Sequence, residues 1–165
     1  MTLGINYLAR HMCGTLFLLL VSCGAFADRG ALNSDVTQAT IARTICVPHY
    51  TQNVRPASSF TDGVKQLLLK RGGLDPSTAA DYELDHIIPL AIGGHPRNLD
   101  NLQLQPWEEA KRKDRIEVKL QCLVCAGQIA LSDAQREIVD DWHAAYHRYA
   151  GVKCDRHRAR SISHE

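Results

Sequence analysis

Two short segments in which polar and apolar residues alternate most constrain what this chain can fold into. Residues 82–88 (YELDHII) alternate and then turn apolar, and residues 101–105 (NLQLQ) alternate strictly. A period of two indicates β-strands, and a proline and a Gly-Gly pair between the segments indicate a loop. Pro106 then suits the first position of a helix, where its missing N–H costs nothing. We therefore predict a two-stranded hairpin followed by a helix, within an α+β fold.

Helices are also expected on both sides of this block. Residues 61–71 carry apolar side chains on one face and end at a Gly-Gly pair. Ser132 and Gln135 have the spacing of a capping box, and a helical apolar stripe follows them up to Gly151. In front of the first helix, residues 28–45 predict a loosely packed polar arm, and residues 46–56, with two prolines, predict an extended segment.

The first 27 residues have the layout of a secretory signal peptide. Arg10 precedes an apolar run at 16–21, and Ala25-Phe26-Ala27 offers an A-x-A cleavage site. The run is shorter than the roughly 20 residues of a permanent membrane span. We expect export to the periplasm or the exterior. The stretch ending at Cys23 also resembles a lipobox, so a membrane-tethered lipoprotein stays open as the alternative.

Cleavage at the A-x-A site leaves four cysteines: Cys46, Cys122, Cys125 and Cys154. An even number in an exported chain favours disulfides, and four cysteines allow three pairings. A zinc site is the rival interpretation. It is weaker, because Cys122 and Cys125 form one C-x-x-C half-site with no second pair beside it.

Polar residues capable of chemistry gather in the predicted hairpin and helix. Glu83, Asp85 and His86 end the first strand, Asn101 begins the second, and Asp114 lies in the helix. Hydrolysis of a phosphodiester needs a base that deprotonates water and positive charge near the phosphate. A histidine, whose pKa lies near neutrality, suits the first task, and a divalent cation held by carboxylates suits the second.

The order Glu83-Leu84-Asp85-His86, with Asn101 fifteen residues after His86, resembles the motif of HNH (ββα-metal) endonucleases. The motif covers about residues 82–120. Beyond it, Cys46-Val47-Pro48, Val54-Arg55-Pro56 and residues 123–142 resemble a subgroup of small exported bacterial HNH-like proteins. The resemblance implies a metal-dependent hydrolase that cuts nucleic acid, expected to be DNA.

The resemblance also implies roles for these residues. His86 matches the general base and Asp85 matches the metal ligand beside it. Asn101 matches an asparagine that orients the base or holds the loop, and in some branches binds metal, while Glu83 matches an acidic residue that supports the site. In the subgroup, cysteines lie at the positions of Cys46 and Cys125. A disulfide between these two is therefore implied, which leaves Cys122 to pair with Cys154.

The chain departs from the family at the third motif position. A histidine usually lies nine residues after the asparagine, but here that residue is Ala110. Asp114, one helical turn further, can supply a carboxylate instead, with Glu109 and Glu117 as weaker substitutes. A site built from Asp85 and Asp114 would favour Mg²⁺ or Mn²⁺ over Zn²⁺.

Four basic residues of the same helix, which flank Asp114, are expected to contact the phosphate backbone. They are Lys111, Arg112, Lys113 and Arg115. The alternative is a solvated helix face held by i,i+4 ion pairs, such as the pair of Glu108 with Arg112. The formal net charge of +1 gives no general attraction to nucleic acid, so any binding surface must be local.

The predicted organisation is a signal peptide (1–27), an arm and extended segment (28–60), an HNH nuclease domain with flanking helices (61–151) and a basic tail (152–165). Two other functions remain open. A degenerate nucleic-acid-binding module would bind with a strong salt dependence but not cut. An envelope structural protein would use Asp85, His86 and Asn101 only as a buried polar network.

Overall fold

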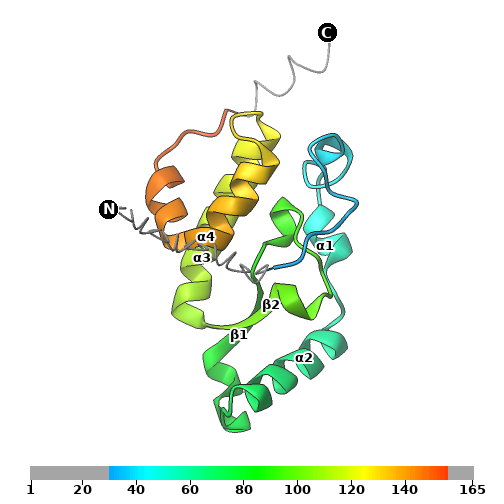
Figure 1. The fold of residues 1–165 in the computed structure, drawn as a ribbon, viewed down its shortest axis with the longest axis vertical. Coiled ribbons are helices and arrows are strands. Elements are labelled where there is room, and N and C mark those ends of the chain that lie inside the picture. The colour runs from blue at the N-terminus through cyan, green and yellow to red at the C-terminus, as the bar shows by residue number, and fades with distance from the viewer. Residues whose placement is uncertain (1–29, 156–165) are drawn as a thin grey trace, which may run out of the picture.

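The structure is a computed structural model that describes residues 30–155, and it combines helices with a small antiparallel sheet (Figure 1). This confirms the predicted α+β class. In chain order the elements are η1 (Ile41–Arg43), α1 (Tyr50–Val54), α2 (Ser58–Arg71), η2 (Pro76–Asp81), β1 (Tyr82–His86), η3 (Leu90–Ile92), η4 (Leu99–Asn101), β2 (Leu102–Pro106), α3 (Trp107–Cys125) and α4 (Leu131–Tyr149).

Some of the predicted features lie outside the described residues. They are the signal peptide, the lipobox cysteine Cys23 and the tail beyond Asp155. Between residues 30 and 155, no helix is both long enough and apolar enough to cross a membrane.

The hairpin forms where the alternating segments predict it. β1 and β2 pair antiparallel, with Glu83 opposite Gln105, Asp85 opposite Gln103 and His86 opposite Leu102. α3 starts directly after β2, so the sheet leads into the long helix without a loop. The three elements lie in the middle of the molecule, with α2 below them in the view of Figure 1 and α4 beside α3.

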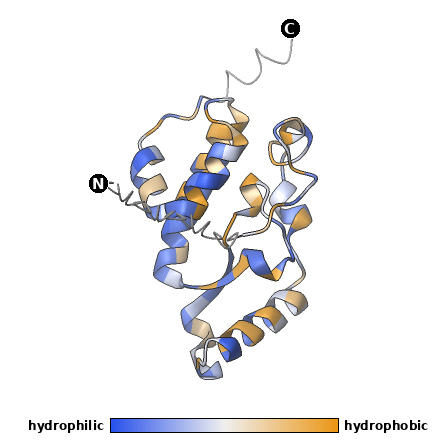
Figure 2. Cartoon of the chain, in the orientation of Figure 1, coloured by the Kyte–Doolittle hydropathy of each residue, from blue (hydrophilic) through white to orange (hydrophobic). Residues whose placement is uncertain are grey.

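The main core lies between α3, α4 and the loop that carries η3. α3 and α4 pack along each other, and the apolar residues of η3 fill the space beside them. Burial of these aliphatic side chains supplies the main drive for folding. Both helices turn polar surfaces outward, and α2 alternates apolar and polar stripes in the same way (Figure 2). The buried core residues include Ile88, Ile92, Ile116, Leu120, Val124, Leu131, Ala134 and Ile138.

The start of α4 differs from the prediction. Ala130 is the N-cap and its own side chain makes no capping bond, so Ser132 and Gln135 do not form a capping box. Gln135 instead donates its side-chain amide to the carbonyl of Ile92 (2.9 Å), which ties α4 to the η3 loop. The amide of Leu131 is satisfied from elsewhere in the chain, by the side chain of Gln38 (2.7 Å).

α4 is also kinked. Asp141 has extended backbone angles (φ −164°, ψ 97°), and its carboxylate accepts hydrogen bonds from the amides of His143 and Ala144. It therefore acts as the N-cap of a second helical segment. Helical periodicity alone did not predict this break.

The N-terminal arm is packed rather than loose. Val36 and Ile45 are buried in the main core. Backbone hydrogen bonds join Gly30 to Asp100 and Asn33 to Gly93, which fixes the arm against the hairpin loop. A few isolated apolar residues anchor this polar segment, and isolated residues give no periodic signal in sequence.

Residues 46–56 are not extended throughout, because α1 forms between Tyr50 and Val54. His49 precedes α1 in the left-handed region (φ 64°), which lets the chain turn sharply into this short helix. The helix predicted at 61–71 is α2, and it begins three residues earlier, at Ser58.

Two disulfides staple the end of α3 to distant parts of the chain. Cys46 is bonded to Cys125 and Cys122 to Cys154, which confirms the expected pairing. Their Cα atoms are 5.5 and 6.0 Å apart, within the usual range for disulfides. The zinc interpretation of the C-x-x-C segment is therefore wrong, because both thiols are bonded elsewhere.

Candidate active site at the end of the hairpin

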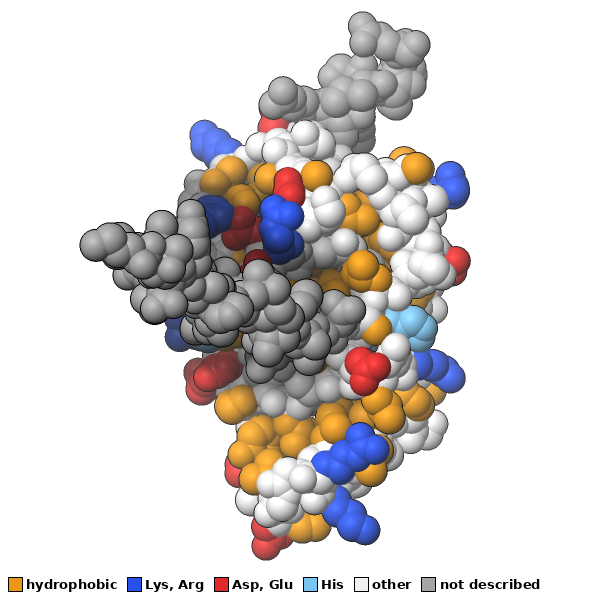
Figure 3. Space-filling view, viewed as in Figure 1, with side chains coloured by type: hydrophobic (Ala, Val, Ile, Leu, Met, Phe, Trp, Pro, Cys, Tyr) orange, Lys and Arg blue, Asp and Glu red, His pale blue; other side chains and the backbone are white. Residues whose placement is uncertain are grey.

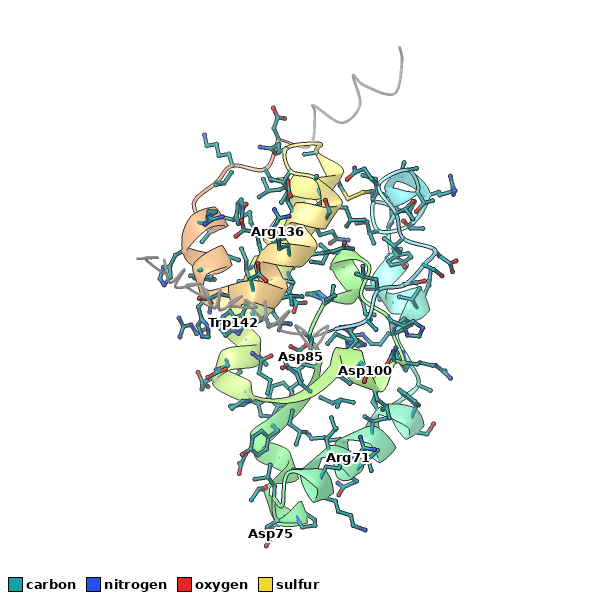
Figure 4. The ribbon with its side chains drawn as sticks, in the orientation of Figure 1. Arg71, Asp75, Asp85, Asp100, Arg136 and Trp142 are labelled. Atoms are coloured by element: carbon teal, nitrogen blue, oxygen red, sulfur yellow. A yellow bond between two sulfur atoms is a disulfide. The ribbon has the colours of Figure 1, made fainter. Side chains whose placement is uncertain are left out.

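The predicted catalytic residues meet where β1 ends. Neighbouring side chains of a strand point to opposite faces, so Asp85 and His86 leave the strand on different sides. Asp85 lies against α3, in the middle of the molecule (Figure 4). His86 lies against the loop that joins the two strands, where it meets the carbonyl of Pro96. Because the strand ends at His86, both side chains border the same end of the hairpin.

Asn101 holds this loop closed. It is fully buried, and its Oδ1 accepts a hydrogen bond from the amide of Ile88 (2.8 Å). Its Nδ2 donates to the carbonyls of Ile88 and His95, both at 3.0 Å. The side chain thus forms all of these hydrogen bonds with backbone groups of the loop. Holding the loop is one of the roles that the sequence implied for Asn101, and this geometry leaves no side-chain atom directed at a ligand.

Gly94 is part of the same closure. A Cβ at this position would lie 1.7 Å from the carbonyl oxygen of Ile88 and 2.8 Å from Nδ2 of Asn101. Only glycine allows the two ends of the loop to approach so closely.

The surroundings of His86 suit a neutral base. Its backbone amide donates to Oδ1 of Asp85 (2.7 Å), and its ring Nε2 lies 3.2 Å from the carbonyl oxygen of Pro96. A carbonyl only accepts, so Nε2 carries the hydrogen and the lone pair of the neutral ring lies on Nδ1. Burial lowers the pKa of His86 below its usual value, against the opposing effects of the Pro96 carbonyl and of Asp85. The ring is therefore neutral at pH 7.

Lys113 is buried beneath the hairpin instead of facing solvent. Only 1% of its surface is exposed, and its ammonium Nζ is surrounded by Oδ2 of Asp85 (2.8 Å), the backbone oxygen of His86 (2.7 Å) and Oε1 of Glu117 (2.7 Å). Burial lowers the pKa of Lys113, but the two carboxylates outweigh this effect and the net pKa is raised. Lys113 is thus not available for the phosphate contact that the sequence suggested, because all three of its N–H bonds are used inside the protein.

Acidic residues dominate the charge around this ammonium. Burial, followed by repulsion from Asp85, raises the pKa of both Glu83 and Asp114. Burial raises the pKa of Glu117 to about 7, in spite of its contact with Lys113. One ammonium cannot compensate all of these carboxylates, so the cluster keeps an excess of negative charge.

The two carboxylates predicted to bind metal do not form a metal site with a third donor. Ala110, at the position of the usual histidine, is buried and contributes no ligand atom. Asp114 is exposed, whereas Asp85 is already bound to Lys113. Across residues 30–155, no group of three or more histidine, cysteine or acidic side chains is arranged to hold a metal ion. The donor set therefore does not fit a divalent cation as the sequence predicted.

The other three basic residues that flank Asp114 in α3 are exposed. Lys111 forms an ion pair with Glu108 (3.3 Å), and Arg112 lies over the ring of Trp142, 6.0 Å from its centroid. Arg115 is also exposed. On the face seen in Figure 3, acidic and basic side chains are interspersed rather than gathered into one patch. This face therefore shows no continuous basic surface for nucleic acid.

Arg55 is a site residue that sequence analysis missed. It ends α1, is exposed, and is followed by the buried Pro56. Its positive charge lowers the pKa of Glu83, Asp114 and His86, so it lies close enough to act on these groups. No local sequence pattern predicts this role, because it depends on how α1 packs against the rest of the fold.

His95, which lies in the hairpin loop, has a structural role. Its Nδ1 accepts hydrogen bonds from the amides of Arg97 (3.1 Å) and Asn98 (3.0 Å), which shapes the turn before η4. The ring is therefore oriented by the loop and does not join His86.

A hollow next to the site is lined by other residues. It lies between the N-terminal arm and α4, where Asp100 and Arg136 are labelled in Figure 4, and its lining also includes Ile88 and Gln135. None of the predicted catalytic residues lines it. This hollow is therefore not the place where His86 would meet a substrate.

Comparison of the chain with protein-family models, with curated proteins and with solved structures found no significant match.

Proposed function

We propose that this chain is an HNH-type phosphodiesterase that cleaves nucleic acid, with His86 as the general base and the β1–β2–α3 unit as its ββα core. The observation that carries the proposal is the state of His86. A buried imidazole donates Nε2–H to a backbone carbonyl, is neutral at pH 7, and lies at the end of a rigid hairpin. This arrangement fixes the tautomer in which Nδ1 can take a proton.

In the proposed reaction, Nδ1 of His86 removes a proton from water while the water oxygen forms a bond to phosphorus. The bond from phosphorus to the leaving oxygen breaks, and the leaving oxygen takes a proton from solvent. Arg55 is an exposed cation whose charge acts on the groups of the site, and it would neutralise the phosphate. The loop closed by Asn101 keeps the Pro96 carbonyl in place and so positions the base.

DNA is the expected substrate, because the resemblance in sequence is to enzymes that cut DNA. Phosphate contacts from a few arginines position a strand without selecting its sequence, so we expect low sequence specificity. A divalent cation such as Mg²⁺ or Mn²⁺, held by Asp85 and Asp114, would supply positive charge at the phosphate. Because the side chains of residues 30–155 do not form a site for such a cation, none of the reaction steps above uses one.

A binding module without hydrolysis is the second candidate. Two observations favour such a module: Ala110 stands where the motif usually has a histidine, and Asp85 forms an ion pair with Lys113. The exposure of Lys111, Arg112 and Arg115 also favours contact with nucleic acid over a purely structural role for this helix.

The test is cleavage of supercoiled plasmid, and of single-stranded DNA and RNA, by the purified chain. His86→Ala is compared with wild type and with His143→Ala, the same change at an exposed residue of α4. We expect wild type and His143→Ala to cut and His86→Ala to lose at least a hundredfold in rate. Equal cutting by all three would contradict the assignment of the base. Binding without cutting would establish the binding module instead.

A further inference from the structure

Lys113 is a buried charged residue that takes no part in the reaction proposed above. A lysine with 1% of its surface exposed is rare, because an ammonium loses its hydration on burial. Here three protein oxygens replace the water: Oδ2 of Asp85, Oε1 of Glu117 and the backbone oxygen of His86, all within 2.8 Å. A charged group so fully coordinated by the protein is a fixed cation.

The position of this cation matches the one that a metal would need. It contacts the carboxylate predicted as the metal ligand, and it contacts the backbone of the proposed base itself. A divalent ion bound to Asp85 would lie beside an ammonium that is already 2.8 Å from the same carboxylate, and like charges repel. The two cations therefore compete for one place.

α3 determines which side chain fills that place. The usual metal-binding position of the motif is the buried Ala110, and Lys113 lies one helical turn later on the same face of α3. The small side chain at 110 leaves the hairpin face of the helix to the long side chain at 113. Glu117, one further turn along, holds the ammonium from the other side (Nζ to Oε1 2.7 Å).

We propose that the Lys113 ammonium takes the place of the divalent cation at the His86 site, so that hydrolysis by this chain needs no metal. This inference rests on the proposed nuclease function. Lys113 acts as a positioning residue: it compensates Asp85, which orients the amide of His86, and it holds the carbonyl of the same residue. It does not touch the substrate.

The first measurement is made on wild type and needs no variant. Plasmid cleavage is followed in excess EDTA and in Mg²⁺ or Mn²⁺, with the His86→Ala rate subtracted. Binding of Mn²⁺ to the protein is followed by electron paramagnetic resonance without substrate. We expect rates within about twofold in EDTA and in metal, and no Mn²⁺ bound at micromolar concentrations. Loss of cleavage in EDTA, or one Mn²⁺ bound per chain at micromolar concentration, would overturn the inference.

The second measurement uses Lys113→Met, which removes the charge but keeps most of the side-chain length. Lys111→Met is the matched control, because it makes the same change on the exposed face of the same helix. We expect Lys113→Met to gain Mn²⁺ binding, since Asp85 and Glu117 lose their cation, and to need Mn²⁺ for cleavage. Lys111→Met should behave like wild type in both assays. A folded Lys113→Met that cuts in EDTA as fast as wild type would contradict the role of the ammonium.

These measurements distinguish failure of the proposed nuclease function from failure of the inference about Lys113. If wild type cuts no substrate under any condition, the nuclease proposal fails, but Mn²⁺ binding still decides whether Lys113 holds the place of the metal. If wild type cuts only with a divalent ion, the nuclease proposal stands and this inference fails. If Lys113→Met does not fold, the wild-type measurements decide alone.

Discussion

Replacing Asn101 by alanine should be one of the most destabilising single changes available in this fold. The side chain is fully buried and makes three hydrogen bonds to backbone groups, at 2.8, 3.0 and 3.0 Å. Alanine would leave the amide of Ile88 and the carbonyls of Ile88 and His95 without these partners in a buried loop. An unsatisfied buried group costs about 1–3 kcal/mol, and small shifts of the two carbonyl groups would recover part of that cost. We therefore expect a loss of about 3–5 kcal/mol, a large share of the 5–15 kcal/mol typical of a folded domain.

The assay is equilibrium unfolding in guanidinium chloride with both disulfides intact, followed by far-ultraviolet circular dichroism and tryptophan fluorescence. Asn98→Ala is the matched control, because Asn98 makes a single side-chain bond, to the amide of Asp100 (2.9 Å). That change should cost about 1 kcal/mol, as for the loss of a helix cap. A loss below 1 kcal/mol for Asn101→Ala, or a loss equal to that of Asn98→Ala, would refute the idea that Asn101 closes the loop.

The same variant should change the state of the base. Loosening the loop lets water reach His86, whose pKa is lowered mainly by burial. The pKa of His86 should therefore rise toward its ordinary value, about 6.5, in the variant. Titration of the imidazole resonances by NMR measures this directly. An unchanged pKa in a folded Asn101→Ala protein would separate the loop from the site and contradict the coupling.

Further predictions concern pH, the disulfides and the phosphate site. The carboxyl of Glu117 binds a proton more tightly in the folded chain (pKa about 7) than unfolded, so folding stability falls as pH rises between about 4.5 and 7. The free energy of unfolding of wild type, minus that of Glu117→Gln, should fall by about 2 kcal/mol from pH 5 to 8; a constant difference would contradict the raised pKa. Replacing both Cys46 and Cys125 by serine should lower the free energy of unfolding by about 4 kcal/mol, because their disulfide closes a loop of 79 residues. A thermal or denaturant midpoint unchanged from wild type would refute this. Cleavage at low substrate concentration should reach half its maximum below pH 6.5, since His86 must be neutral and its pKa is lowered; a midpoint above pH 7 would assign the base elsewhere. Arg55→Ala should weaken nucleic-acid binding about tenfold and reduce the slope of log affinity against log salt by about one, whereas an unchanged slope would exclude a phosphate contact.

The hairpin and the helix after it could be predicted from sequence because local rules decide them. Alternation of polar and apolar residues fixes which face of a strand is buried, and Pro106 marks the start of α3. Loop closure by Asn101 was also among the roles that the resemblance to the HNH motif implied for this residue. These features depend on residues close in sequence or on one spacing.

The roles of Lys113 and Arg55 could not be predicted, because they depend on how separate elements pack. In sequence, Lys113 is one of four basic residues that flank Asp114 in a charged helix, and nothing local distinguishes it from Lys111. The rotation of α3 against β1 buries one of them and exposes the other. The capping box at Ser132 failed for a similar reason, since Gln135 forms a hydrogen bond with the distant η3 loop in place of its own helix.

The charge at the hairpin end also restricts how a polyanion could approach it. Lys113 lies between two carboxylates, Asp85 and Glu117, and Glu83 and Asp114 add further acidic groups to the cluster. A phosphate backbone would be repelled by this cluster unless other cations lie along its path. One such cation is Arg55, which follows α1, is exposed and acts on the charges of this cluster. We therefore expect a bound strand to contact Arg55 where it approaches His86, with the buried ammonium of Lys113 reducing the repulsion from Asp85 and Glu117.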